Sequence, residues 1–350
     1  MNNHACPIRL VSMSLISFTA LFAASVAWGA TLVVANKSEA TVSLLDLESG
    51  EVAATLETGE GPHEVGISPD GRFALVTNYG SRGNTGNSLT LVDITTASAV
   101  KTIDLGEYKA PHGVEWIDAE RAAVTVEANQ ALALVDVAKG EVVQTIGTDQ
   151  KVSHMVALDP DGQWAYTSNM GSGTMTVLDL DAGQRIRNVA TGEGAEGIAV
   201  SGAGHIWVTN REDDTLTVLD GITFTVLKEI TSAGFPIRAT ATPKEQVLVT
   251  RARAGDLVVY DAKTFKELRT VAFDLESLGS DGRLFRDRFG DSSVPIGVVV
   301  DDTGDRAFVA HANADVITEV DLTTGQVVRV LRAGREPDGM GYSPLAVDQE

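Results

Sequence analysis

Hydrophobic and polar residues alternate with a period of two over short stretches of this chain. Residues 62–67 and 73–78 form two such runs, separated by a Ser-Pro-Asp-Gly turn at 68–71. Two further apolar runs follow, at 89–92 and 99–103. Alternation by two predicts β-strands, because helices place apolar residues three and four positions apart. The unit is therefore predicted to be a four-stranded antiparallel sheet.

The same unit recurs along the chain, and an aspartate after its third strand marks each copy. These aspartates are Asp46, Asp93, Asp136, Asp179, Asp220, Asp261 and Asp321. Their first five spacings lie between 41 and 47 residues, and the last spacing is 60. A period near 40–45 residues with four strands per copy is typical of a β-propeller blade.

The two ends of the chain complement each other. Residues 31–57 hold a second, third and fourth strand, whereas residues 338–347 hold only a first strand. Pairing that last strand with the N-terminal three closes a ring and removes the exposed sheet edges. The sequence therefore predicts an all-β fold, a seven-bladed β-propeller with six continuous blades and one composite blade.

The repeat resembles the YVTN-type β-propellers, a family related to the haem d1 domain of nitrite reductase. The resemblance covers nearly all of the chain after residue 29 and rests on the turn and second-strand sequences 68–71 with 75–78, 159–162 with 166–169, and 207–210. It implies the fold. It also allows several functions, because relatives include zinc-carrying periplasmic chaperones, lactonases and d1 domains that hold haem with histidines at a propeller mouth.

Residues 1–29 are predicted to be a signal peptide and residues 30–350 a single propeller domain. Arg9 precedes an apolar run from Leu10 to Ala27, and small residues at 27 and 29 suit cleavage. An uncleaved anchor is the alternative. The only cysteine, Cys6, lies inside the leader, so the mature chain has no disulfide or thiolate ligand. We expect a periplasmic or secreted protein with no membrane attachment after cleavage.

The formal net charge of the chain is −21. Such a surface repels phosphate backbones, so nucleic-acid binding is disfavoured. We expect a monomer whose partners are a small ligand or metal and a periplasmic protein. The sequence has no nucleophile elbow, phosphate loop or dinucleotide fingerprint, which favours a binding protein over an enzyme.

One position near the start of each first strand gathers candidate ligands. In chain order it holds His63, His112, His154, Glu196, Ile237, Ile296 and Asp338. In ring order the five polar residues are consecutive, so they are predicted to form a polar arc at one mouth of the channel. Imidazole and carboxylate donors suit zinc, copper or iron. The sequence therefore predicts a transition-metal or haem site formed by His63, His112, His154, Glu196 and Asp338.

The same mouth receives the ends of the second strands, predicted at Asn36, Asn78, Glu127, Asn169, Asn210, Arg251 and His311. Two long connections also lie there, residues 79–88 and residues 273–295, and the second is predicted to be a lid. Cations at the mouth suit the carboxylates of a tetrapyrrole or another anion. The predicted cofactor-binding residues are Arg251, Arg283, Arg286, Arg288 and His311.

Other interpretations of the histidines remain open from the sequence. Side chains alternate along a strand, so the imidazoles may instead pack between blades and bond to backbone carbonyls. A histidine may also act as an acid or base. The main functional hypothesis is a periplasmic binding propeller holding a metal or metal-bearing cofactor. The alternatives are a d1-haem-type oxidoreductase or lactonase-like enzyme, and a protein-interaction scaffold without a small ligand.

Overall fold

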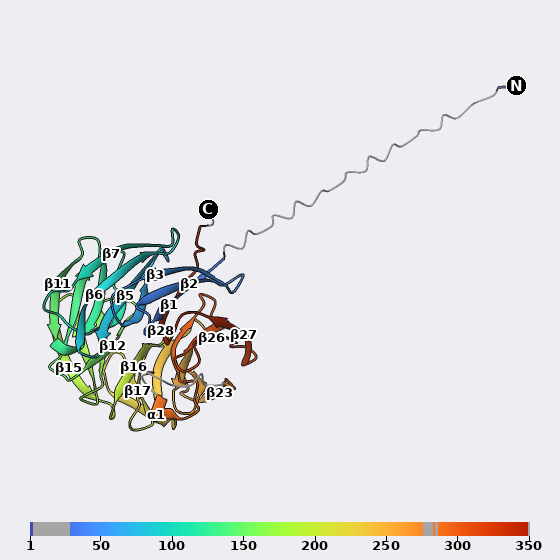
Figure 1. Cartoon of the computed structure of the whole chain (residues 1–350). Coiled ribbons are helices and arrows are strands. Elements are labelled where there is room, and N and C mark those ends of the chain that lie inside the picture. Colours follow the sequence, from blue (N-terminus) through green and yellow to red (C-terminus); the bar gives the residue numbers. More distant parts are fainter. Residues whose placement is uncertain (3–28, 276–282, 284–285, 349–350) are drawn as a thin grey trace.

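The computed structural model describes residues 1–2, 29–275, 283 and 286–348. The described chain folds into seven four-stranded antiparallel sheets arranged as blades around a central channel (Figure 1). This confirms the predicted seven-bladed β-propeller. Most of the predicted signal peptide, residues 3–28, lies outside the described residues, as does part of the predicted lid.

Each blade is one sheet whose first strand lines the channel and whose fourth strand lies outermost. The strands are β1 (Thr31–Asn36), β2 (Thr41–Asp46), β3 (Val52–Glu57), β4 (Pro62–Ile67), β5 (Phe73–Ser81), β6 (Asn84–Asp93), β7 (Ser98–Asp104), β8 (Pro111–Trp116), β9 (Arg121–Val126), β10 (Ala131–Asp136), β11 (Glu141–Gly147), β12 (Ser153–Leu158), β13 (Trp164–Asn169), β14 (Thr174–Asp179), β15 (Gln184–Ala190), β16 (Ala195–Val200), β17 (His205–Asn210), β18 (Thr215–Asp220), β19 (Val226–Thr231), β20 (Pro236–Ala241), β21 (Gln246–Arg251), β22 (Asp256–Asp261), β23 (Glu267–Ala272), β24 (Pro295–Val300), β25 (Arg306–His311), β26 (Val316–Asp321), β27 (Gln326–Arg332) and β28 (Pro337–Ser343).

The ring closes as the sequence predicts. Strand β28 pairs antiparallel with β1, with Tyr342 opposite Leu32 and Gly341 opposite Val33. The composite blade is therefore β28, β1, β2 and β3. We call it blade A, and the blades that begin with β4, β8, β12, β16, β20 and β24 are blades B to G. Closure leaves no unpaired first strand beside the channel among the described residues.

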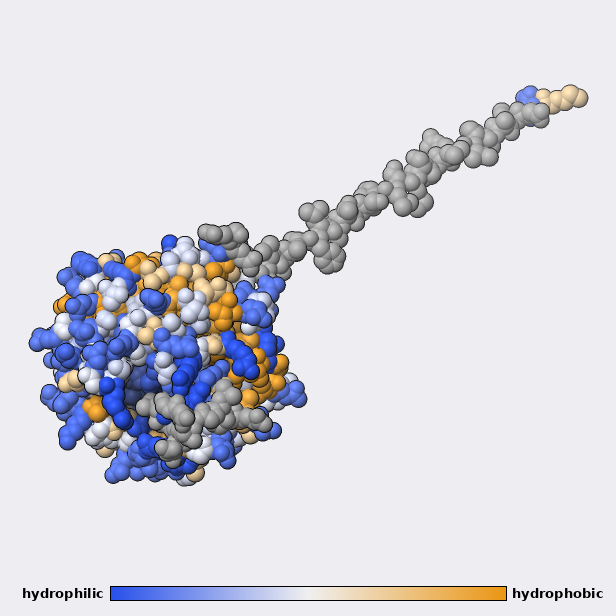
Figure 2. Space-filling view, in the orientation of Figure 1, coloured by the Kyte–Doolittle hydropathy of each residue, from blue (hydrophilic) through white to orange (hydrophobic). Residues whose placement is uncertain are grey.

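The hydrophobic core lies between neighbouring blades. Leu75 of blade B packs in one cluster with Val124 and Ala133 of blade C, and all three are fully buried. Each blade buries its middle strands in this way, so stability comes from blade-to-blade packing. The outermost strands are more exposed. Figure 2 shows hydrophobic residues on the side of the ring where β27 lies, and Val328 and Val330 are about half exposed there.

Every first strand contains a β-bulge close to its start. The pairing register with the second strand shifts between Pro62 and Val65 in blade B, and between Pro111 and Val114 in blade C. Corresponding shifts occur in the other five blades. A bulge interrupts side-chain alternation and re-aims the residues within it. This feature decides which side chains reach the channel mouth.

The bulge also brings the first strands of neighbouring blades close together. A Cβ on Gly339 would lie 2.2 Å from the carbonyl oxygen of His63, and one on Gly297 would lie 2.0 Å from that of Asp338. These glycines are required by the close backbone approach. The narrow packing gathers side chains from different blades within contact distance at the mouth.

Two connections differ from the simple loops predicted. The 79–88 connection is an extension of the β5–β6 hairpin, with strand pairing as far as Ser81 and Asn84. The 273–295 segment includes a short helix, α1 (Arg286–Phe289), and a 3-10 turn, η1 (Glu127–Asn129), follows β9. Neither of these helices, the only two in the described chain, has the length or apolar character to cross a bilayer.

Candidate functional site

Three histidine rings stand in a row at the channel mouth. His112 on β8 lies between His63 on β4 and His154 on β12, with ring centroids 4.1 and 3.7 Å apart. All three side chains are buried. The structure thus brings together imidazoles that are 42 or more residues apart in sequence, because each occupies the same position in successive blades.

A ring of hydroxyl groups on the second strands holds this row in place. Thr125 of blade C accepts a hydrogen bond from the Gly113 amide and donates one to the His154 carbonyl of blade D, at 2.8 and 2.6 Å. Thr77 does the same one blade earlier, between the Glu64 amide and the His112 carbonyl. Each hydroxyl therefore ties the bulge of its own blade to the site residue of the next blade.

His63 is held as a neutral imidazole. Its Nδ1 lies 2.8 Å from Asp338 Oδ2, and its Nε2 lies 3.1 Å from Lys37 Nζ. An ammonium group can only donate, so Nε2 is the acceptor and Nδ1 carries the proton. Burial and the charge of Lys37 lower the pKa of His63, and Asp338 only partly offsets them. Lys37 also pairs with Asp338 at 3.0 Å.

His154 is held as an imidazolium between two carboxylates. Its Nδ1 lies 2.5 Å from Glu127 Oε1, and its Nε2 lies 3.3 Å from Glu196 Oε1. Burial works to lower the pKa of His154, but these two carboxylates outweigh burial and raise it. Tyr79, on the extended hairpin, donates a hydrogen bond to the second oxygen of Glu127 at 2.6 Å.

A buried charge network lies beside the histidine row. Arg238 of blade F bridges Glu196 and Glu64, at 3.1 and 2.5 Å, and Arg211 pairs with the other oxygen of Glu196. Burial alone would raise the pKa of Glu196, but His154 and the two guanidinium groups lower it to about 2. Asp338 is held ionised in the same way, with its pKa well below the usual range.

The charges at the mouth balance one another. The four cations are Lys37, His154, Arg211 and Arg238, and the four anions are Glu64, Glu127, Glu196 and Asp338. A balanced set is what a buried site of this size needs, since an unpaired buried charge costs several kcal/mol. This buried network is therefore polar without a net charge of its own.

His112 differs from its two neighbours because it has no polar partner. The side chain is 1% exposed, and neither ring nitrogen makes a hydrogen bond within the described part of the chain. Burial, the charged neighbour His154, and His63 lower its pKa far below the usual value. Burying an unpaired polar group costs about 1–3 kcal/mol. A neutral imidazole with a free lone pair is also the form that binds a metal.

His112 belongs to both groups of side chains that can hold a metal ion. One group is His63, Glu64 and His112, and the other is His112, Glu127 and His154; in each, the donor atoms lie within 4.8 Å of one another. Ligand atoms around a tetrahedral zinc ion lie about 3.4 Å apart. The donor set fits a borderline metal after small side-chain movements. Such movements would break the Lys37–His63 contact or displace the proton of His154.

The structure places the predicted cofactor-binding residues elsewhere at the same end of the propeller. Arg251 forms a bidentate pair with Asp256, Arg283 pairs with Asp315 and the Ala312 carbonyl, and Arg288 pairs with Glu212. These guanidinium groups are thus bound to carboxylates of the chain. The side chain of Arg286 lies outside what the structure describes.

His311 occupies a structural position. Its Nδ1 lies 2.9 Å from the Ser293 hydroxyl and its Nε2 lies 2.9 Å from the Thr318 hydroxyl. Asn36, Asn78 and Asn210 make corresponding contacts with hydroxyl groups on the third strands of their own blades. Both nitrogens of His311 are therefore engaged within its blade, and burial lowers its pKa to about 3.

Sequence analysis left six residues that complete the site out of its predicted ligand sets, and of these it placed only Glu127 at the mouth: Lys37, Glu64, Tyr79, Glu127, Arg211 and Arg238. The structure ends β9 at Val126, so Glu127 lies one residue beyond the strand end to which it was assigned. Lys37 and Arg211 also directly follow their second strands. Glu64 and Arg238 lie in the bulges, one residue after the aligned position. Tyr79 directly follows Asn78, where the sequence analysis placed the end of its second strand. A search of the two adjacent positions in every repeat, together with the predicted strand ends, would therefore have found all six residues.

Comparisons with known proteins relate this chain to d1-type β-propellers. Residues 118–247, which include β9 to β20, match the profile of the cytochrome D1 heme domain. No curated protein sequence matches the chain. Among solved structures, the chain is similar to the dihydro-heme d1 dehydrogenase NirN in complex with DHE, with a TM-score of 0.59 and 17% identity. That alignment covers 89% of this chain and 74% of NirN, and at this identity it establishes the fold alone.

Proposed function

We propose that this propeller binds a d1-type haem or a closely related tetrapyrrole at the histidine mouth, with His112 as the nitrogen ligand to its metal. The observation that carries the proposal is the pair of unpartnered ring nitrogens on His112, buried among charged side chains and imidazoles that each have at least one polar partner. The profile match and the NirN fold support the choice of ligand class. Export to the periplasm by the predicted leader is part of the proposal.

The residues of the mouth have distinct roles in this proposal. The neutral imidazole of His112 supplies a lone pair without first losing a proton, because its pKa is low. Lys37, Arg211 and Arg238 would offer cations to acidic ring substituents by exchanging their present carboxylate partners. The bound group would supply a redox-active iron, and His154 holds a proton on an imidazole beside it. Tyr79 and Glu127 fix the position of that imidazole.

The test is a titration of the purified, untagged protein with hemin, followed by optical absorption, together with the metal content of the protein as isolated. We expect His112→Ala to abolish the shifted haem band and to leave the circular dichroism spectrum unchanged. His205→Ala is the matched control, because His205 begins β17 at the end of the propeller opposite the histidine mouth, where its Nδ1 bonds to the Ala262 carbonyl. Equal hemin binding by His112→Ala and wild type would contradict the proposal.

A bare transition-metal ion is the second candidate, favoured by the two donor groups that share His112. Protein isolated with a stoichiometric metal but no visible chromophore would support this candidate over the first. Ligation by His154 requires the loss of its proton. Because the pKa of His154 is raised, Zn²⁺ affinity measured by calorimetry should increase as the pH rises through that pKa.

A further inference from the structure

The histidine row is closed to solvent at its centre, although His112 is the residue proposed to bind a metal. This residue is 1% exposed. His63 and His154 flank its ring, with centroids 4.1 and 3.7 Å away, and the ring of Tyr79 lies edge-on to it at 5.6 Å. A molecule that reaches the nitrogens of His112 therefore has to displace one of these neighbours.

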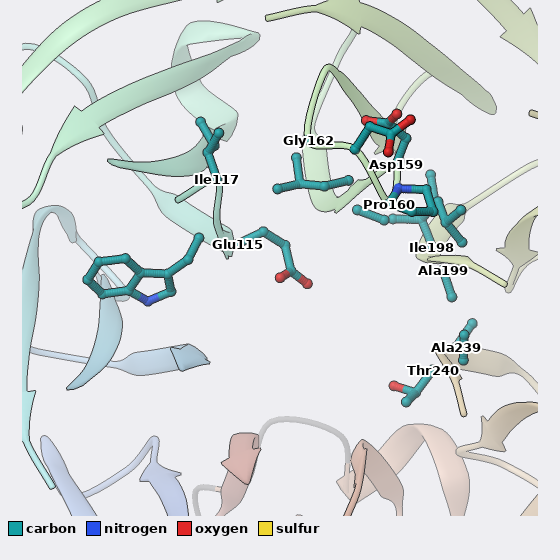
Figure 3. A pocket seen from close by; sticks show the side chains of 15 residues that line it. Glu115, Ile117, Asp159, Pro160, Gly162, Ile198, Ala199, Ala239 and Thr240 are labelled. Carbon is teal, nitrogen blue, oxygen red and sulfur yellow. The ribbon is translucent and has the colours of Figure 1, made fainter. Parts of the chain in front are cut away.

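Within the described chain, the channel does not lead from its opposite end to His112. An open cavity of ≈ 450 Å³ lies at that end, lined by the first strands β8, β12, β16 and β20 from their fourth residue onward (Figure 3). Arg238 of blade F and Glu64 of blade B are the third residues of their first strands, and they form a buried ion pair across the channel. This pair lies between the cavity and the histidine row, so the way to His112 is from the mouth.

Tyr79 is the neighbour of His112 that can move at the lowest cost. His63 and His154 are buried, and each has polar partners at both ring nitrogens. Tyr79 is only partly buried, and the bond from its hydroxyl to Glu127 is the one polar contact of its side chain among the described residues. Glu127 keeps His154 as its partner when the tyrosine leaves. Movement of Tyr79 thus leaves no buried charge unpaired, which would be the costly outcome.

The backbone beneath Tyr79 is fixed, so the available movement is a rotation of its side chain. The Tyr79 amide donates to the Gly61 carbonyl at 3.1 Å, and the Gly80 amide donates to the Glu60 carbonyl at 2.8 Å. A Cβ on Gly61 would lie 2.1 Å from the Gly80 carbonyl oxygen, so the extended hairpin lies tightly against this loop. Lifting the hairpin would break these bonds, whereas rotation of the side chain breaks only the bond to Glu127.

Tyr79 belongs to an addition that blade B alone carries. Strands β5 and β6 have nine and ten residues, whereas the second and third strands of the other blades have six. Tyr79 directly follows Asn78, and the residues at this position in the other blades are not aromatic: Lys37, Glu127, Met170, Arg211, Ala252 and Ala312. The repeat therefore does not require an aromatic ring here, and this ring lies over the one histidine that has no polar partner.

We propose that Tyr79 is a gate over His112, held closed by its hydrogen bond to Glu127 and opened by rotation of its side chain toward solvent. The open form leaves an edge of the His112 ring free for the metal of an incoming ligand. This inference rests on the function proposed for His112, but access to the ring can be measured without haem. A hydrogen bond to a charged group favours the closed form about ten- to a hundredfold, so the open form is a minor state of ~1–10%.

The experiment measures how fast diethyl pyrocarbonate modifies His112 in the ligand-free mature chain at pH 7, by mass spectrometry of its peptides. This reagent acylates neutral imidazole nitrogens that solvent can reach. We expect slow modification in the wild type and a rate about ten- to a hundredfold higher in Tyr79→Phe, which lacks the hydroxyl. Tyr79→Ala, which lacks the covering ring, should react faster still. An unchanged His112 rate in both variants would overturn the proposal.

Three controls separate a gate from a general loosening of the fold. His205 is partly exposed at the opposite end of the propeller, and its rate should be the same in every variant. His311 is fully buried, so a rise in its rate equal to that of His112 would show loosening and overturn the proposal. Tyr166→Phe removes a hydroxyl that lies 3.5 Å from the Gly221 carbonyl oxygen, and it should leave His112 at the wild-type rate. An equal increase in Tyr166→Phe would also overturn the proposal.

Hemin binding separates this inference from the function proposed above. The association rate of hemin should rise in Tyr79→Phe by the same factor as the modification rate, because both depend on the population of the open form. Hemin association that Tyr79→Phe does not change would overturn the gate alone. If hemin binds neither wild type nor variant, the proposed function fails, and the modification rates still decide whether Tyr79 controls access to His112.

Discussion

The polar and apolar arcs of the same mouth show how one repeated backbone can form two different surfaces. Blades A to E place Asp338, His63, His112, His154 and Glu196 at the aligned position, whereas blades F and G place Ile237 and Ile296 there. The residue after the second strand follows this division in part: it is alanine at 252 and 312 in blades F and G and charged in blades A, C and E, but it is Met170 in blade D. The bulges are present in all seven blades. The difference therefore lies in two side-chain positions per blade and not in the backbone.

The apolar arc is where the predicted lid is anchored. Phe289 of α1 packs against Phe235, with ring centroids 4.9 Å apart, in a cluster that also contains Ile237 and Ile296. Arg288 lies over the Phe235 ring at 4.5 Å and pairs with Glu212. The apolar arc thus holds a connecting segment by packing, while the polar arc gathers titratable groups. Changes on the two arcs should have separable effects on stability and on ligand binding.

The largest expected loss of stability comes from neutralising Glu196, the carboxylate at one end of the polar arc. Glu196→Gln keeps the shape of the side chain but leaves Arg211, Arg238 and His154 without their shared anion. Removing one partner from such a buried network costs roughly 3–5 kcal/mol. We expect that loss in the free energy of unfolding, measured in urea at pH 7.

The control is Asp305→Asn, which breaks the exposed Lys244–Asp305 pair. This surface pair should contribute less than about 1 kcal/mol. A loss for Glu196→Gln no greater than that of the control would show that the network is not energetically coupled as the geometry indicates.

The next effect tests whether His311 is structural, unlike the histidines of the polar arc. His311→Asn installs the residue found at this position in blades A, B, D and E. Burial lowers the pKa of His311 to about 3, below the usual 6.5, so the folded state binds fewer protons than the unfolded state as the pH falls. The contribution of neutral His311 to wild-type stability is present above pH 6.5 and is lost as the pH falls below that value. The His311→Asn variant has no imidazole to protonate, so it does not lose stability in this way.

In urea unfolding at pH 4.5, His311→Asn should be more stable than wild type by roughly 2–3 kcal/mol, at about 1.4 kcal/mol per pH unit. At pH 7.5 the variant should be equal or slightly less stable, because asparagine fills less space. Its hemin binding should match wild type. Loss of hemin binding in this variant would instead make His311 part of the ligand site.

Most of the architecture could be predicted from the sequence, because its signals are local and repeated. The period of Asp93, Asp136 and Asp179 gives the blade length, and alternation by two gives the strands. The composite blade followed from the missing first strand at residue 31 and the unpaired strand at 338. These signals depend on strand propensity and turn residues within each repeat, so one sequence is sufficient.

The site was only partly predictable. The aligned first-strand position led to the histidine row, because residues at one position of a closed ring must converge. The partners were not found, because a bulge makes residues 63 and 64 both available to the mouth, and alternation predicts that only one is. The end of β9 was also placed one residue late, which left Glu127 among the wrong residues. The isolation of His112 depends on the absence of partners from three blades, which only coordinates reveal.

The smallest expected change in stability comes from removing one threonine hydroxyl on each arc. Thr125 donates to the His154 carbonyl at 2.6 Å, and Thr250 donates to the Ile296 carbonyl at 2.8 Å. Thr125→Val and Thr250→Val each remove a buried hydrogen bond that joins two blades, so each should lower the free energy of unfolding by about 1–2 kcal/mol. Only Thr125 fixes the backbone that carries the histidine row, so only Thr125→Val should also weaken hemin binding. Equal losses of hemin affinity in the two variants would mean that ligand binding depends on the rigidity of the whole ring and not on the local position of His112 and His154.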